Sequence, residues 1–258
     1  MTDHVKVTQA DGVQTITLAR PDKKNALSNV MYGRLADAIL AANNDPALRI
    51  LVIQAEGDMF TAGNDVGEFA ATSRGENTNE ERHVVRFLHA LAQSSRPVMA
   101  AVNGRAVGVG TTMLLHCDFV LLGEDALLST PFVNLGLVPE AASTLQLTAR
   151  VGHLRAYEMF ALGEPVNATQ ALAWGLANRV VAKADLHIEA DRIARVLAAK
   201  PLGSLMATKR LMRNTQAVIA QMQAESTEFV TRLQSPEAKE AFAALMERRA
   251  PDFSKFGG

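Results

Sequence analysis

The sequence predicts an α/β fold in which parallel strands are covered by helices. Strand-like and helix-like segments alternate over residues 1–200, and the apolar run at residues 50–53 is typical of a strand buried on both faces. After Pro201 the pattern is helical up to about Arg249. We therefore expect a core over residues 1–200 and a helical region over residues 201–258 that packs on the core or on a neighbouring subunit.

The individual elements follow from periodicity and turn residues. Alternating side chains around Asp11-Gly12 predict a hairpin, and helical spacing over residues 30–42 ends at an Asn-Asn-Asp-Pro sequence. The polar segment from Ser73 to Asn79 is predicted to be a mobile loop beside a ligand site. Further strands are expected at residues 50–53, 97–102, 119–122, 127–128 and 177–181, and further helices at residues 80–93, 108–116, 141–151, 154–162, 168–174 and 186–199.

Composition narrows the partners and the compartment. The 26 Lys and Arg residues against 27 Asp and Glu give a net charge of −1, which argues against nucleic acid as a partner. A single cysteine, Cys117, rules out an internal disulfide and fits a reducing compartment. The chain shows no secretory signal and no apolar stretch of about 20 residues, so we expect a cytoplasmic protein without a membrane partner.

Two segments of small residues follow successive predicted strands. Residues 60–65 read FTAGND, and residues 103–110 read NGRAVGVG and open a predicted helix. Free N–H groups at such positions suit a negatively polarised oxygen, and two loops after neighbouring strands could converge on one atom. Glycines that merely permit tight turns are the plainer alternative. A phosphate loop is poorly supported, because neither a third glycine nor a Walker lysine follows Gly110.

Four strings carry a resemblance to a known family. KKNALS (23–28), FTAGNDVGE (60–68), the segment from Arg96 to Leu122 and TPFVNLGLVPEAAST (130–144) resemble the enoyl-CoA hydratase/isomerase, or crotonase, family in order and spacing. The resemblance covers nearly the whole chain. It implies a spiral of ββα units, C-terminal helices that assemble a homotrimer or hexamer, and a coenzyme A thioester as substrate with no metal or redox cofactor.

The resemblance also implies roles for particular residues. The N–H groups of Ala62 and Val109 would form an oxyanion hole on the thioester carbonyl. The family usually has glycine at the second position, so Val109 is a departure that a backbone contact tolerates. The expected substrate contacts are Lys24, Ala26, Leu27, Ala62, Gly63, Asn64, Asp65, Gly108 and Phe132, with Lys24 near the phosphates of coenzyme A.

The acidic residues separate two reactions within the family. By the same resemblance, family hydratases carry two glutamates at positions that here hold Thr112 and Phe132, whereas the string around Glu140 resembles the subgroup that moves a double bond with a single glutamate. One base suffices to take a proton from C2 and return it at C4. Apolar neighbours would raise the pKa of Glu140. Alternatively, Glu140 is an ordinary acid stabilised in the first turn of a helix.

We therefore predict an enoyl-CoA isomerase, with two rival interpretations. One is an enoyl-CoA hydratase, a lyase of fatty-acid degradation. The other is a non-catalytic CoA- or RNA-binding member of the fold, which the balanced charge and Glu140 disfavour. Asp65 and Glu68 could line the pocket, but their spacing at a helix start is more often that of a capping box. The histidine spacing predicts no metal site.

Overall fold

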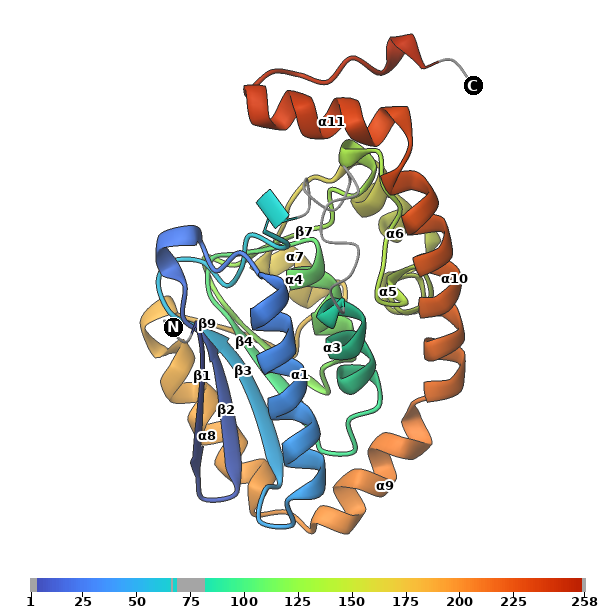
Figure 1. Ribbon diagram of the computed structural model, residues 1–258. Helices are drawn as coiled ribbons and strands as arrows, with labels where there is room; N and C mark the ends of the chain where they lie inside the picture. Colours follow the sequence, from blue (N-terminus) through green and yellow to red (C-terminus); the bar gives the residue numbers. More distant parts are fainter. Residues whose placement is uncertain (1–3, 66, 69–81, 257–258) are drawn as a thin grey trace.

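Two β-sheets lie at the centre of the chain (Figure 1), which a computed structural model describes for residues 4–65, 67–68 and 82–256. The larger sheet has the order β1-β2-β3-β4-β6-β9, and only the β1–β2 pair is antiparallel. Its strands are β1 (Val5–Ala10), β2 (Val13–Leu18), β3 (Ile50–Ala55), β4 (Val98–Val102), β6 (Phe119–Gly123) and β9 (Arg179–Val181). The smaller sheet contains β5 (Arg105–Val107), β7 (Leu127–Ser129) and β8 (Val166–Asn167).

Helices cover both faces of the larger sheet, which explains why β3 is apolar along its whole length. Ile50 and Val52 pack with α8 (Leu186–Ala198), whereas Leu51 and Ile53 belong to the cluster that includes α1 (Asn29–Asn44) and α3 (His83–Ala92) (Figure 1). Successive side chains of a strand point to opposite faces, so both sets must be apolar. The predicted α/β architecture with covered parallel strands is confirmed.

The remaining helices surround the smaller sheet and form the C-terminal region. They are α4 (Val109–Thr112), α5 (Ser143–Val151), α6 (His153–Leu162), α7 (Ala168–Ala173), α9 (Leu202–Met212), α10 (Thr215–Leu233) and α11 (Pro236–Glu247). Short 3-10 turns are η1 (Pro21–Lys23), η2 (Met113–His116), η3 (Val133–Leu135), η4 (Lys183–Asp185) and η5 (Phe253–Lys255). None of the described helices is both long and apolar enough to span a membrane.

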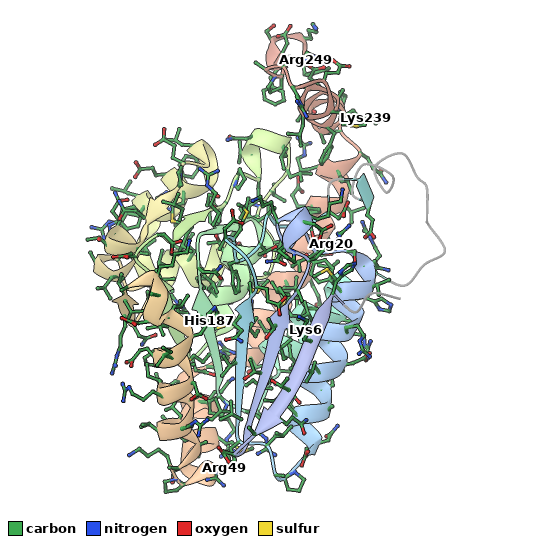
Figure 2. The ribbon with its side chains drawn as sticks, turned by 90° about the vertical axis from the view of Figure 1, so that its left-hand side faces the viewer. Lys6, Arg20, Arg49, His187, Lys239 and Arg249 are labelled. Carbon is green, nitrogen blue, oxygen red and sulfur yellow. The ribbon has the colours of Figure 1, made fainter. Side chains whose placement is uncertain are left out.

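The C-terminal helices are joined to the core by apolar packing. Val218 and Met222 of α10 and Phe242 of α11 belong to the same buried cluster as the main sheet. Figure 1 shows α10 running alongside α5 and α6. Figure 2 shows Lys239 and Arg249 at the projecting α11 end, opposite Arg49. The predicted helical character after Pro201 is confirmed for the described residues.

Two details of the prediction differ from the structure. The helix expected over residues 108–116 is divided into α4 and η2, and strands β5 and β8 were not predicted. β5 lies inside the glycine-containing segment that the sequence presented as a loop. The expected loop from Ser73 to Asn79 lies outside the described residues.

Candidate active site

The two small-residue segments lie against each other. Thr61 forms a parallel bridge with Ala106, and Asn64 forms one with Leu27, so residues 61–64 run between two neighbouring segments. Only glycine fits at two points of this contact. A Cβ on Gly63 would lie 2.8 Å from the Val107 carbonyl oxygen, and a Cβ on Gly110 would overlap Cγ2 of Thr61. The glycines therefore bring two backbones together, as well as permitting turns.

The backbone directions identify the free N–H group of the first segment. The Gly63 carbonyl accepts a hydrogen bond from the Leu27 N–H at 2.8 Å. Because the C=O and N–H of one trans peptide point in opposite directions, the Asn64 N–H points away from Leu27, toward the segment of Val107. No acceptor for this N–H is found among the residues that the structure describes.

The expectation for Ala62 is corrected by the same hydrogen bonds. The Ala62 N–H donates to the Lys24 carbonyl oxygen at 2.9 Å, so it is engaged within the fold and points away from the second segment. The residue two positions later, Asn64, presents the free amide. The sequence placed both residues in the site, but which of their two amides is free depends on how this segment pairs with Leu27 and Ala106.

The Val109 N–H, which the sequence proposed as the second donor, has no acceptor among the residues that the structure describes. Gly108 has φ 57° and ψ −117°, and its carbonyl accepts from the N–H groups of Thr111 and Thr112. Its C=O therefore points along α4, and the Val109 N–H on the same peptide points out of the N-terminal end of the helix. Val109 itself is buried, 1% exposed, so its side chain packs in the core.

Glu140 lies at a buried turn before α5 and is held by a threonine. The Thr112 hydroxyl donates to Glu140 Oε1 at 2.5 Å. Burial raises the pKa of Glu140 from its ordinary 4.5 to about 7, with the Thr112 hydrogen bond opposing this rise and the charge of Glu225 adding to it. A carboxylic acid with a pKa near neutrality can both accept and donate a proton.

The two positions where hydratases carry glutamates are occupied differently. Thr112 is fully buried and directs its hydroxyl to Glu140, so it positions an acid without being one. Phe132 is 5% exposed and lies beside Gly108, where an added Cβ would meet its ring at 4.0 Å. Phe132 is therefore placed as an apolar wall next to the Val109 amide.

Tyr32 is a polar residue of this region that the sequence did not single out. Its hydroxyl donates to Asn64 Oδ1 at 2.5 Å, and its pKa is raised well above 10.0 by burial and then by the charges of Glu140 and Glu68. It lies on the apolar face of α1, among core positions. No pattern in the sequence distinguishes such a tyrosine from an ordinary core residue.

The predicted coenzyme A contacts lie along one edge of the first segment. Ala26 and Leu27 precede α1, and Asp65 forms an ion pair with Arg20 at 2.7 Å. Lys24 is exposed and pairs with Asp58 at 2.9 Å, which leaves it accessible from solvent. The Arg20 label in Figure 2 marks this edge, near the start of α1.

The other candidates from the sequence have structural explanations. Asp65 Oδ1 accepts from the Gly67 N–H at 3.0 Å and from the Glu68 N–H at 3.4 Å. The bond from the Glu68 N–H is one of the two hydrogen bonds that define the expected capping box. Cys117 is buried, and burial raises its pKa to about 12. In the described part of the chain, His, Cys, Asp and Glu side chains form no cluster able to hold a metal ion.

Comparison with known proteins establishes the family. The profile of the enoyl-CoA hydratase/isomerase family matches residues 8–255. The chain therefore belongs to the enoyl-CoA hydratase/isomerase family, whose members are acyl-CoA enzymes.

Relatives in this family carry different reaction names. The chain is 33% identical over 250 residues to a 2,3-dehydroadipyl-CoA hydratase of Escherichia coli, covering 96% of this chain and 97% of the relative. It is 33% identical over 215 residues to enoyl-CoA delta isomerase 2 of Rattus norvegicus, covering 82% of this chain and 55% of the relative. An enoyl-CoA hydratase/isomerase crystal structure from Pseudoalteromonas atlantica superposes with a TM-score of 0.92 at 40% identity, covering 98% and 100% of the two chains.

Proposed function

We propose that this enzyme isomerises a 3-enoyl-CoA to a 2-enoyl-CoA with Glu140 as the single proton shuttle. The observation that carries the proposal is the Thr112–Glu140 hydrogen bond of 2.5 Å, beside an apolar Phe132. At the two positions where hydratases carry glutamates, this chain has Thr112, whose hydroxyl donates to Glu140, and the apolar Phe132. Activation of water by a pair of carboxylates is therefore not supported by these side chains.

The proposed reaction uses Glu140 twice. Its carboxylate takes a proton from C2, so the C2–H bond breaks and its electron pair enters a dienolate. The proton then returns from Glu140 to C4, a C4–H bond forms, and the double bond ends between C2 and C3. The carboxylate is regenerated, and a pKa of about 7 suits both transfers because neither protonation state is strongly disfavoured.

The charge that develops on the thioester oxygen would be stabilised by two backbone donors. In the proposal these are the Asn64 and Val109 N–H groups, both left free by the hydrogen bonds around them. Donors fixed in place before the reaction need no reorganisation, and one such donor is typically worth a hundred- to a thousandfold in rate. The Tyr32 hydroxyl would fix the Asn64 side chain through its hydrogen bond.

The coenzyme A moiety would lie along residues 24–27 and 63–65. Lys24 is exposed at this edge and would meet the phosphates, although it must first leave Asp58. An exposed ion pair contributes little free energy, so Lys24 can exchange Asp58 for a phosphate at a small cost in free energy.

We also propose assembly into a homotrimer or hexamer through the C-terminal half. Large apolar side chains are exposed there on the single chain, on α6 and α9. Leu154 is 83% exposed, Leu211 85% and Met212 83%. Such groups are more often covered by a partner subunit than left in water.

The test is a product analysis with the purified protein. Incubation with a 3-enoyl-CoA should give a product of unchanged mass that coelutes with the 2-enoyl-CoA, whereas incubation with the 2-enoyl-CoA should add no water. A product heavier by one water from the 2-enoyl-CoA, with no isomer from the 3-enoyl-CoA, would make the enzyme a hydratase. No conversion of either thioester would remove the proposal.

A further inference from the structure

The turn that follows Glu140 is strained. Ala141 has φ 63° and Ala142 has φ 55°, so two consecutive residues with side chains occupy the left-handed region. Left-handed backbone is unfavourable for residues with side chains and persists only where surrounding contacts hold it. The direction of Glu140 depends on this turn because the turn leads directly from Glu140 into α5.

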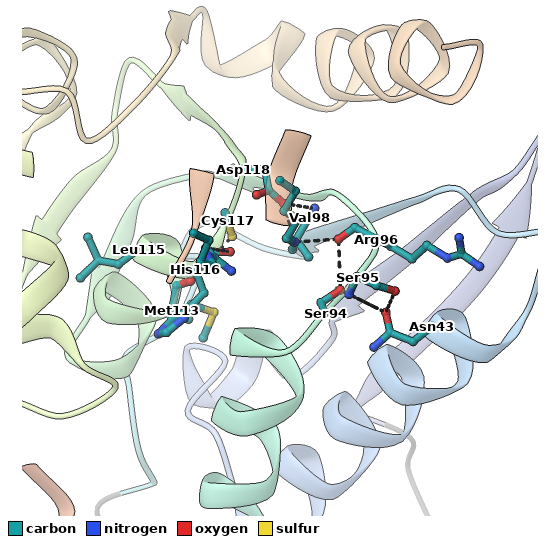
Figure 3. A network of polar contacts seen from close by, with 12 residues as sticks. Asn43, Ser94, Ser95, Arg96, Val98, Met113, Leu115, His116, Cys117 and Asp118 are labelled. Carbon is teal, nitrogen blue, oxygen red and sulfur yellow. Dashed lines mark hydrogen bonds and ion pairs between the residues drawn. The ribbon is translucent and has the colours of Figure 1, made fainter. Parts of the chain in front are cut away.

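One contact on the turn comes from His116 in η2. Its Nε2 lies 2.8 Å from the Ala141 carbonyl oxygen. Burial lowers the pKa of His116 to about 3, so the ring is neutral and donates its Nε2–H to this carbonyl. The His116 backbone is itself fixed, because Arg213 donates to its carbonyl at 2.7 Å. Figure 3 shows His116 between Met113 and Cys117 in the polar network of this region.

A second side-chain contact, just after the turn, is made by Glu225 in α10 with Thr144 of α5. The N-cap residue of α5 is Ala142, whose side chain offers no acceptor for the first amides of the helix. Glu225 replaces the missing cap from 81 residues away: its Oε1 accepts from the Thr144 N–H at 2.9 Å and from the Thr144 hydroxyl at 2.5 Å. Burial raises the pKa of Glu225, and hydrogen bonds from Thr144 and from the amides of Ala142 and Ser143 oppose this rise.

We propose that Glu225 is a positioning residue for Glu140, because its carboxylate caps α5 and thereby holds the left-handed turn that presents Glu140 to the acyl chain. The proposal rests on the proposed function, in which Glu140 is the base. It makes α10 of the C-terminal region part of the catalytic apparatus, although Glu225 itself touches no reacting atom.

The groups that face Glu140 give this role a measurable electrostatic consequence. Glu225 on α10 adds negative charge, Thr112 on α4 donates a hydrogen bond, and Tyr32 on α1 is an un-ionised hydroxyl within the field of Glu140. His116 on η2 is neutral. Removal of the Glu225 charge should therefore lower the pKa of Glu140, whereas loss of an uncharged helix cap would leave it unchanged.

Two substitutions separate positioning from charge. Glu225→Ala removes the cap, and we expect kcat on the 3-enoyl-CoA to fall ten- to a hundredfold with KM within about twofold, since a misplaced base costs rate and not binding. Glu225→Gln keeps an acceptor for the Thr144 N–H, so most of kcat should remain while the acidic limb of the kcat/KM profile moves to lower pH. Glu228→Gln, whose side chain is 58% exposed on the same helix, is the matched control and should change neither.

A second measurement is independent of turnover and covers the case in which Glu225→Ala fails to fold. Glu140→Gln is combined with Glu225→Gln, and the melting-temperature difference due to Glu140→Gln at pH 8 is compared with its value in the unaltered chain. A smaller difference in the Glu225→Gln background supports the proposal. Unchanged kcat in Glu225→Ala, or an unmoved pH limb together with an equal melting difference, would overturn it. Absence of isomerase activity in the unaltered chain would instead refute the proposed function, and the melting comparison would still decide whether Glu225 acts on Glu140.

Discussion

Replacing Glu140 with glutamine should strongly lower turnover and at the same time stabilise the folded chain at high pH. The pKa of Glu140 lies at about 7 in the folded protein and 4.5 is its ordinary value, a difference that corresponds to about 3 kcal/mol at 1.36 kcal/mol per unit. The folded state holds the proton more tightly than the unfolded state, so ionisation of Glu140 lowers stability as the pH rises from about 4.5 to about 7. Glu140→Gln removes this loss.

Two assays measure the effect of Glu140→Gln: turnover and thermal unfolding. Loss of general acid–base catalysis should lower kcat on a 3-enoyl-CoA by on the order of a hundredfold or more, with little change in affinity for an unreactive thioester. The variant should also melt higher at pH 8 by up to roughly 6–12 °C, since 1 kcal/mol corresponds to roughly 2–4 °C in chains of about this size. Partial contact of Glu140 with solvent makes this an upper limit, and the gain should vanish below about pH 4.5.

Glu164→Gln is the matched control for this experiment. Glu164 is exposed in the connection between α6 and β8, so its replacement should alter neither turnover nor the pH dependence of melting. Retention of more than a tenth of the turnover by Glu140→Gln would show that Glu140 is not the shuttle. An equal melting temperature of the variant and the unaltered chain at pH 8 would show that the folded protein does not raise the pKa of this group.

The Thr112 hydroxyl, the Gly110 backbone and the exposed apolar side chains of α9 each have a measurable consequence. The kcat/KM for a 3-enoyl-CoA should decrease below about pH 7, because protonated Glu140 cannot accept a proton. Thr112→Val removes a hydrogen bond that lowers the pKa of Glu140, so it should move this acidic limb of the pH profile to higher pH. A limb that stays in place would contradict the assignment of Glu140 as the base. Gly110→Val should reduce kcat by roughly a hundred- to a thousandfold, because the valine side chain would overlap Thr61 and displace the Val109 amide. Gly203→Val on α9 is the control: an added Cβ there meets no atom within 4 Å, so kcat should be unchanged. Sedimentation at micromolar concentration should give a trimer or hexamer, and Leu211→Glu on α9 should shift the distribution toward monomer; an intact chain that sediments as a monomer would refute the assembly.

The sequence predicted the layers of the fold because its apolar patterns are regular. The buried run at residues 50–53 became β3, and the strand-free pattern after Pro201 became α9, α10 and α11. β5 was missed because it has three residues and its pairing with β7 is non-local, so no local pattern announces it. Val166 and Asn167 in β8 were missed for the same reason.

The site was predictable where chemistry depends on side chains and less so where it depends on backbone direction. Glu140 was proposed from its string, and the structure adds Thr112 as its hydrogen-bond partner. The resemblance assigned the first donor to Ala62, which is wrong because that amide bonds to Lys24; only the hydrogen bonds around the bridge to Leu27 identify the Asn64 amide instead. Glu225 left no signal, because its partner Thr144 lies 81 residues away.

The proposed single-base mechanism requires the opposing influences that act on the pKa of Glu140. A shuttle must accept a proton at C2 and release it at C4, so its pKa has to lie near the working pH, neither as low as that of a solvated carboxylate nor so high that the group stays protonated. Burial and the Glu225 charge raise the pKa, and the Thr112 hydroxyl lowers it. A glutamate at position 112 would replace the donor with a second negative charge and raise the pKa of Glu140 further. Thr112→Glu should therefore lower isomerase turnover at pH 7, and an increase would show that the site prefers the two-carboxylate arrangement of a hydratase.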